Sequence, residues 1–293
     1  MPERSVNGGL PVLAGAALGL AGFGLLGAQA VRLADARRAG AAWARLAALG
    51  AAAAPPAGFH PAMTEGLPDP ARRYFLRAIA LGTPLRRVAE IEMEGEFGLG
   101  DRAAPRYLRM RARQLIAPPH GFVWVAAMRG RWPMRISGSD AYVQGEAWTR
   151  FWLLGSIPVA RAGGTPDIAR SAAARAIAEA ALWVPAALLP GEDVHWEPLD
   201  ARHARVVVRH RGESVPLDLE VAEDGRLLSL VIPRWSDANP ERVFRLQPFG
   251  GTIEESGSFQ GYTVATRLSA GNHFGTAAYF PFFRPRVTAI RHR

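Results

Sequence analysis

The chain has 293 residues, of which 49% are hydrophobic, and carries a formal net charge of +9. It has no cysteine, and all 35 basic residues are arginine, which excludes disulfides, thiol nucleophiles, cysteine metal sites and any enzyme that needs a lysine amine. The positive charge would permit nucleic-acid binding, but the sequence has no nucleic-acid motif, so we expect no such partner.

The N-terminal segment 5–31 has no charged side chain. A helix rises about 1.5 Å per residue, so this segment is long enough to cross a hydrocarbon layer about 30 Å thick. Ala28-Gln29-Ala30 has the form of a signal-peptide cleavage site, but the apolar run is longer than a signal core. We therefore favour a retained single-pass anchor in a bacterial inner membrane. The arginines after the run favour a cytoplasmic domain, whereas a signal peptide would export it, so the side of the membrane stays open.

The sequence predicts three parts: an anchor with a juxtamembrane helix at 1–50, an Ala/Pro linker at 51–61 and a single domain at 62–293. A helix opens the domain. We expect Asp69 to cap it, Pro70 to occupy its first position and Gly82 to end it.

Two hairpins are predicted from period-two patterns. Residues 88–97 alternate apolar side chains with Glu90, Glu92, Glu94 and Glu96, and the next run alternates them with Arg109, Arg111 and Arg113. Pairing the two strands sets the acidic row against the basic row, with Glu92 opposite Arg111. In the second hairpin, Asp224-Gly225 predicts a two-residue turn with Val221 opposite Leu228 and Leu219 opposite Leu230.

The other strands are expected to be short and linked by turns, with one inserted helix at 166–184 that Thr165 caps and Pro166 begins. We predict a mainly β (α+β) fold, in which one strongly curved antiparallel sheet or half-barrel has its concave face covered by two helices. The further strand candidates are 121–128, 132–138, 141–148, 194–199, 204–211, 242–249, 252–260, 261–268 and 285–292.

Aromatic and polar residues recur together along the chain, which is typical of a binding site in a curved sheet. An acid–base pair is the enzymatic alternative, a hydrolase-type site of Glu179 and His273 with Asp140. Arg175 lies four residues before Glu179, so a simple ion pair on the helix would also explain that carboxylate. We expect no metal site and no cofactor. The candidate ligand-binding residues are Trp124, Tyr142, Glu179, Trp183, Trp235, His273 and Tyr279.

Several motifs resemble a family of uncharacterised bacterial proteins, a domain of unknown function met in membrane or envelope contexts. The resemblance covers most of residues 70–292 and implies no activity. The order of a first helix, a long antiparallel run and an inserted helix is also similar to the lipoprotein-carrier half-barrels, which hold acyl chains in a concave sheet. The matching motifs are Arg73-Tyr74-Phe75, Gly121-Phe122-Val123-Trp124, Asp140-Ala141-Tyr142, the run from Glu179 to Pro185, the run from Gln247 to Gly251, and Asn272-His273-Phe274-Gly275.

These observations favour a membrane-tethered module that binds a lipid-like or other apolar ligand. The sequence leaves two alternatives open, the hydrolase-type enzyme and a structural or interaction module of the cell envelope.

Overall fold

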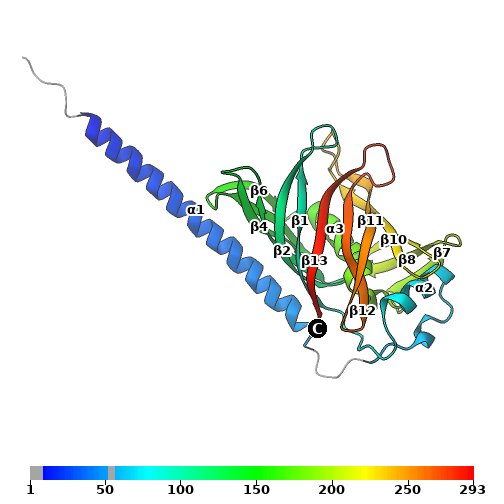
Figure 1. Cartoon of the computed structure of the whole chain (residues 1–293). Coiled ribbons are helices and arrows are strands. Elements are labelled where there is room, and N and C mark those ends of the chain that lie inside the picture. Colours follow the sequence, from blue (N-terminus) through cyan, green and yellow to red (C-terminus); the bar gives the residue numbers. More distant parts are fainter. Residues whose placement is uncertain (1–8, 52–56) are drawn as a thin grey trace, which may run out of the picture.

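The computed structural model describes residues 9–51 and 57–293, with the backbone alone for 9–23. Its thirteen strands form one antiparallel sheet, in the order β6-β5-β4-β3-β2-β1-β13-β12-β11-β10-β9-β8-β7. Neighbouring strands are consecutive in the chain except where β1 pairs with β13, which joins the first and last strands (Figure 1). The strands are β1 (Ala89–Leu99), β2 (Arg106–Ala117), β3 (Gly121–Arg129), β4 (Arg135–Val143), β5 (Glu146–Leu153), β6 (Ile157–Gly163), β7 (Val194–Pro198), β8 (His203–His210), β9 (Glu213–Val221), β10 (Leu227–Ser236), β11 (Arg245–Phe259), β12 (Tyr262–Asn272) and β13 (Phe280–His292).

The sheet bends around the helix α3 (Pro166–Trp183). This helix contacts β3 to β6 in one half of the sheet and β9, β10 and β12 in the other half. One helix can touch both halves only if the sheet is curved, and Figure 1 shows the strands wrapping around it. The helix α2 (Asp69–Ala78) packs on β8, β9 and β12, and its Tyr74 and Phe75 belong to the same core cluster as α3. The prediction of a mainly β protein with one antiparallel sheet is therefore confirmed.

The ends of the two helices differ in how well they were predicted. The Thr165 side chain accepts a hydrogen bond from the Ile168 N–H at 3.4 Å, as expected for the cap of α3. Asp69 was wrongly predicted as a cap, because α2 begins at Asp69 and Pro68 precedes it without a side-chain cap bond. The helix also ends before Gly82, because Ile79 turns to extended backbone and forms a bridge with Tyr262.

Both predicted hairpins form, the first with a shifted register and the second with a shift only next to its turn. The acidic row of β1 faces the basic row of β2, but Glu92 lies opposite Arg113 rather than Arg111. A shift of two residues keeps every side chain on its face, so the alternation could not distinguish the two registers. Leu219 lies opposite Leu230 as predicted.

The turn of the second hairpin is longer than the predicted two residues. It is closed by the Ala222 N–H, which donates to the Arg226 carbonyl, and it places Leu227 opposite Val221. A bulge between Leu227 and Ser229 absorbs the extra residue. Elsewhere the predicted strands 242–249 and 252–260 are one strand, β11.

The C-terminal part of the long helix α1 (Gly9–Ala48) lies on the convex face of the sheet. Ala39, Ala42 and Leu46 are buried against a second apolar cluster that β2, β3, β4 and β5 supply. In the described part of the chain, no helix combines the length and the apolar character that crossing a membrane requires. The predicted anchor at 5–31 falls partly outside that part, which omits residues 5–8 and the side chains of 9–23. Five residues of the predicted linker, 52–56, also lie outside the described residues.

The remaining short helices are single 3-10 turns. The turn η1 (Pro61–Thr64) precedes α2, and η2 (Pro185–Leu188) follows α3 directly.

Candidate functional site

The concave side of the sheet has a cavity of about 690 Å³ beside α3, which we call the α3 cavity. One wall comes from the first half of the sheet, with Tyr142 and Ala147, and the other comes from β9 and β10, with Val215 and Trp235. These walls are far apart in sequence and meet because the sheet curves. Small residues of α3 leave the space open: Ala169, Ala173 and Ala174.

Charged side chains stand at the edge of the α3 cavity. Arg38 pairs with Glu146 at 3.0 Å, and Arg170 pairs with Glu213 at 3.2 Å. Arg211 also lines the cavity, and it forms no ion pair with any described residue. A cavity with apolar walls at Ala169, Ala173, Val215 and Trp235 and an unpaired guanidinium among its charged residues suits a molecule that has an apolar body and an anionic group.

Burial and the charge of Arg211 shift the pKa values of Tyr142 and His210, which both line the cavity. Burial raises the pKa of the Tyr142 phenol, and the positive charge of Arg211 offsets part of that rise. Burial, followed by the charges of His120 and Arg211, lowers the pKa of His210, so this ring is neutral near pH 7. The Trp235 indole donates to Asp167 at 2.7 Å, and the Arg170 guanidinium lies 4.6 Å from its ring centroid.

A buried ionic network lies between α3 and the sheet. The Arg175 Nε donates to Glu179 at 2.6 Å, and its Nη1 donates to Asp140 on β4. The Gln114 amide on β2 also donates to Glu179. Burial alone would lower the pKa of Arg175, but the attraction of Glu179 and Asp140 outweighs it and raises that pKa. The network fixes α3 to β2 and β4.

A second arginine, Arg234 on β10, shares this interior. It donates to Ser171 on α3 at 3.0 Å and lies 4.7 Å from the ring centroid of Phe249. Burial, followed by repulsion from Arg175, lowers the pKa of Arg234 to about 10. It therefore stays charged near neutral pH, without a hydrogen-bonded carboxylate among the described residues.

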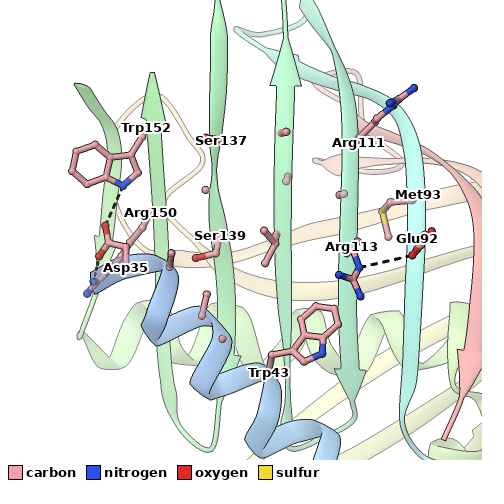
Figure 2. A pocket seen from close by; sticks show the side chains of 18 of the residues that line it. Asp35, Trp43, Glu92, Met93, Arg111, Arg113, Ser137, Ser139, Arg150 and Trp152 are labelled. Atoms are coloured by element: carbon pink, nitrogen blue, oxygen red, sulfur yellow. Dashed lines mark hydrogen bonds and ion pairs between the residues drawn. The ribbon is translucent and has the colours of Figure 1, made fainter. Parts of the chain in front are cut away.

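A further hollow of about 730 Å³, the α1 groove, lies on the opposite, convex face. Figure 2 shows α1 crossing the strands there, with Trp43 near one end and Trp152 near the other. Its floor is made of small side chains such as Ala127, Ser137 and Ser139. The groove is thus largely apolar and is bounded by the helix that leads toward the N-terminus.

Asp35 holds α1 to the sheet at this groove. Its carboxylate accepts from Arg161 at 2.7 Å, from the Trp152 indole at 3.1 Å and from Arg150 (Figure 2 labels Asp35, Arg150 and Trp152). Burial would raise the pKa of Asp35, but hydrogen bonds from Arg161 and Arg150 outweigh it and lower that pKa. Our sequence analysis missed this site. The available signal was that Asp35 is the only acidic residue between Arg4 and Glu65, within a basic helix.

Residues 57–284 match the model of a family of unknown function, DUF6544. The chain belongs to this family. The expected resemblance to an uncharacterised family is therefore confirmed. The match spans the whole sheet up to Arg284 and includes every residue of the α3 cavity except Arg38, whereas α1 precedes it.

Comparison with other proteins adds two similar crystal structures. One is the LolA superfamily protein NE2245 from Nitrosomonas europaea, at 12% identity and a TM-score of 0.37, covering 76% of this chain and 92% of that chain. The other is a domain provisionally described as an outer membrane lipoprotein-sorting protein from Vibrio parahaemolyticus, at 10% identity and a TM-score of 0.34, covering 70% and 85%. No curated protein matches the sequence.

Within the DUF6544 domain, the predicted site residues separate into four places. Tyr142 and Trp235 line the α3 cavity together. Trp124 and Trp183 are buried in the core, where the Trp183 indole donates to the Ala265 carbonyl at 3.1 Å. Glu179 belongs to the ionic network.

The last two predicted residues, His273 and Tyr279, lie at the turn between β12 and β13. The His273 ring nitrogen bonds to the Ala238 carbonyl at 2.9 Å, and the Tyr279 hydroxyl donates to the Ser269 carbonyl at 3.0 Å. Of the proposed acid–base trio, the structure joins Asp140 to Glu179 through Arg175. The hydrogen bonds of the described residues do not connect His273 to either carboxylate.

Proposed function

We propose that the DUF6544 domain of this chain is a membrane-tethered module that binds a lipid-like ligand with an anionic group in the α3 cavity. The observation that carries the proposal is a cavity of about 690 Å³ that combines apolar walls with the unpaired Arg211. That volume falls within the range of about 300–1,000 Å³ that is usual for small-molecule sites.

The fit of such a ligand follows from the cavity walls. Its apolar part would lie against Ala169, Ala173 and Trp235, where burial of hydrocarbon contributes about 25 cal/mol for each Å² removed from water. Its anionic group would lie at Arg211, which can bond a carboxylate or phosphate through two N–H groups. The presence of a cavity of this size favours this function over a purely structural or interaction module, for which we would expect no pocket.

The charge-free segment 5–31 supports the tether. It would hold the domain at the surface of the inner membrane as a single-pass anchor, beside the source of the ligand. A tethered site meets membrane lipids at a high effective concentration, so a modest affinity is sufficient.

Native mass spectrometry of the purified full chain tests the ligand. We expect the wild-type chain to carry an additional mass that extraction identifies as an anionic amphiphile. Ala173→Phe fills the α3 cavity and should remove that mass, because Ala173 lines the cavity and is only half-buried. The matched variant Ala289→Phe, at an exposed position of β13, should retain it. A wild-type chain without any bound amphiphile would contradict the proposal.

A further inference from the structure

We propose that one end of the sheet, formed by the β3–β4 and β5–β6 turns, docks onto a bilayer that contains anionic lipids. We call this surface the docking end. The inference rests on the tether of the proposed function and adds the face of the domain that meets the membrane.

The docking end exposes large apolar side chains. Trp132 in the β3–β4 turn is 90% exposed, and Met134 beside it is 39% exposed. Leu154 in the β5–β6 turn and Ile157 at the start of β6 are 50% and 53% exposed. The two turns are adjacent, because the Leu154 N–H donates to the Arg135 carbonyl at 2.8 Å. Exposed apolar side chains grouped in this way mark an interaction surface, and tryptophan is enriched at membrane–water interfaces.

The same end concentrates positive charge. Arg109, Arg129 and Arg135 lie opposite one another in register across β2, β3 and β4. Arg131 adds a fourth exposed guanidinium in the turn, and residues 102–139 contain no acidic side chain. Arg129, Arg131 and Arg135 form no ion pair with any described residue. Arg109 also lies opposite Glu96 on β1, whereas Arg129 and Arg135 face each other, and like charges placed opposite one another destabilise a sheet. An external anion would therefore stabilise this pair.

The path of α1 places the docking end beside the predicted anchor. The Gln29 amide donates to the Gly155 carbonyl and the Ser156 hydroxyl in the β5–β6 turn, both at 2.9 Å. Upstream of this contact α1 runs away from the domain (Figure 1), and Leu26 is 68% exposed. Gln29 lies near the C-terminal end of the charge-free segment 5–31, since Arg32 is the first charged residue after it. A bilayer that holds this segment would therefore lie against the docking end.

The charge pattern favours an anionic bilayer over a second copy of the chain as the partner of the docking end. A second copy of the chain would present the same arginine row, and like charges would repel. Anionic headgroups instead attract basic side chains by about 1 kcal/mol each near the surface, and Trp132 can enter the interface among them.

The absence of native cysteine allows a direct test with the full chain in lipid vesicles. Ile157→Cys labels the docking end, and Leu81→Cys is the matched control. Leu81 is 72% exposed and follows α2, next to the β11–β12 turn, where the Ala80 N–H donates to the Gly261 carbonyl. An environment-sensitive fluorophore on each cysteine reports whether brominated acyl chains quench it. We expect quenching at position 157 and none at position 81, in vesicles that contain phosphatidylglycerol.

Charge and salt variants complete the test. Replacing one arginine, as in Arg131→Gln, should lower the ratio of membrane-docked to undocked domain about fivefold. Quenching of the label at position 157 reports this ratio. Added salt or phosphatidylcholine alone should lower it as well, whereas Glu65→Gln, at an exposed site near α2, should not.

The outcomes separate this inference from the proposed function. If the chain floats with vesicles but the two labels are equally exposed to water, docking is refuted and the tether stands. If the chain does not associate with vesicles, both the tether and docking fail. If the label at 157 is shielded without lipid, a second copy covers the surface and the bilayer proposal is overturned. Ligand binding in the α3 cavity is tested independently by the bound mass.

Discussion

At the scale of single residues, Arg175 shows how a short pattern identifies an interaction but not its extent. The spacing of four residues predicts its ion pair with Glu179, and the structure confirms that pair at 2.6 Å. Asp140, the other partner of the guanidinium, lies 35 residues earlier in the chain on β4. Sequence reasoning placed Asp140 and Glu179 in one candidate site. It could not supply Arg175 as the residue that joins them, because that contact depends on how α3 lies in the sheet.

His292 provides a prediction of pH dependence. Its ring is buried, stacks on Tyr262 with centroids 4.0 Å apart, and bonds through Nε2 to the Trp183 carbonyl at 2.8 Å. Burial lowers the pKa of His292 from 6.5 to about 4, although the Trp183 carbonyl opposes that change. The unfolded chain therefore binds more protons than the folded chain between these two values.

It follows that the stability due to neutral His292 is complete above pH 6.5 and is lost as the pH falls toward 4. The loss amounts to roughly 3 kcal/mol in the free energy of unfolding. Urea unfolding across this pH range should show that slope in the wild-type chain and a smaller slope in His292→Gln, whose amide can still donate to the carbonyl. Equal slopes in the two proteins would show that His292 does not titrate in this way.

At the scale of elements, the alternation of apolar and charged residues predicted strand faces better than strand partners. Glu92 and Arg113 lie on the faces that period two assigns them, yet their register differs from the predicted one by two residues. The register depends on the length of the β1–β2 turn, which the charge pattern does not encode. Similarly, the extra turn residues after Val221 and the bulge at Leu227 are features of backbone geometry that Asp224-Gly225 alone did not reveal.

The candidate site was also predicted only in part, because backbone geometry decides which side chains share a surface. Tyr142 and Trp235 were expected to share a concave surface, and both line the α3 cavity. Trp183 looks equivalent in sequence, but it lies at the last turn of α3, on the side that meets β12. The α1 groove was not predicted, because the sequence suggested a juxtamembrane helix separated from the domain by a linker, and the solitary Asp35 does not show which face of the sheet α1 packs on.

The contact of α1 with the sheet leads to a second prediction. Asp35→Asn keeps the size of the side chain but removes the charge that Arg161 and Arg150 bond. We expect a loss of about 2 kcal/mol in the attachment of α1. Hydrogen exchange should then accelerate across residues 29–48, while exchange in α3 stays unchanged. The control Glu65→Gln removes an exposed charge outside this contact and should leave α1 protected. If α1 in Asp35→Asn is as well protected from hydrogen exchange as in the wild-type chain, apolar contacts alone hold the helix to the sheet.

At the scale of the whole molecule, curvature is what creates the site. The strands are joined in sequence on either side of a seam, where β1 pairs with β13. Both halves meet α3, so the α3 cavity has one wall from each half. A ligand bound there contacts β4, β5, β9, β10 and α3 together, and it can bind only when these elements are assembled. Binding should therefore stabilise the whole fold against unfolding.

This coupling gives the last prediction, which separates the apolar and anionic parts of the ligand. Dodecyl phosphate and dodecanol have the same hydrocarbon tail but differ in charge. Comparing the two compounds below micelle-forming concentrations therefore measures the contribution of Arg211 to binding. A ligand at 100 times its Kd stabilises the folded chain by about 2.7 kcal/mol, which corresponds to a rise in Tm of roughly 5–10 °C. We expect that rise with dodecyl phosphate and a smaller one with dodecanol. Arg211→Gln should make the two compounds equivalent, whereas Arg226→Gln, in the exposed β9–β10 turn, should preserve the difference. Equal rises in Tm with both compounds in the wild-type chain would contradict the proposal that the ligand needs an anionic group. The cavity would then bind the hydrocarbon alone.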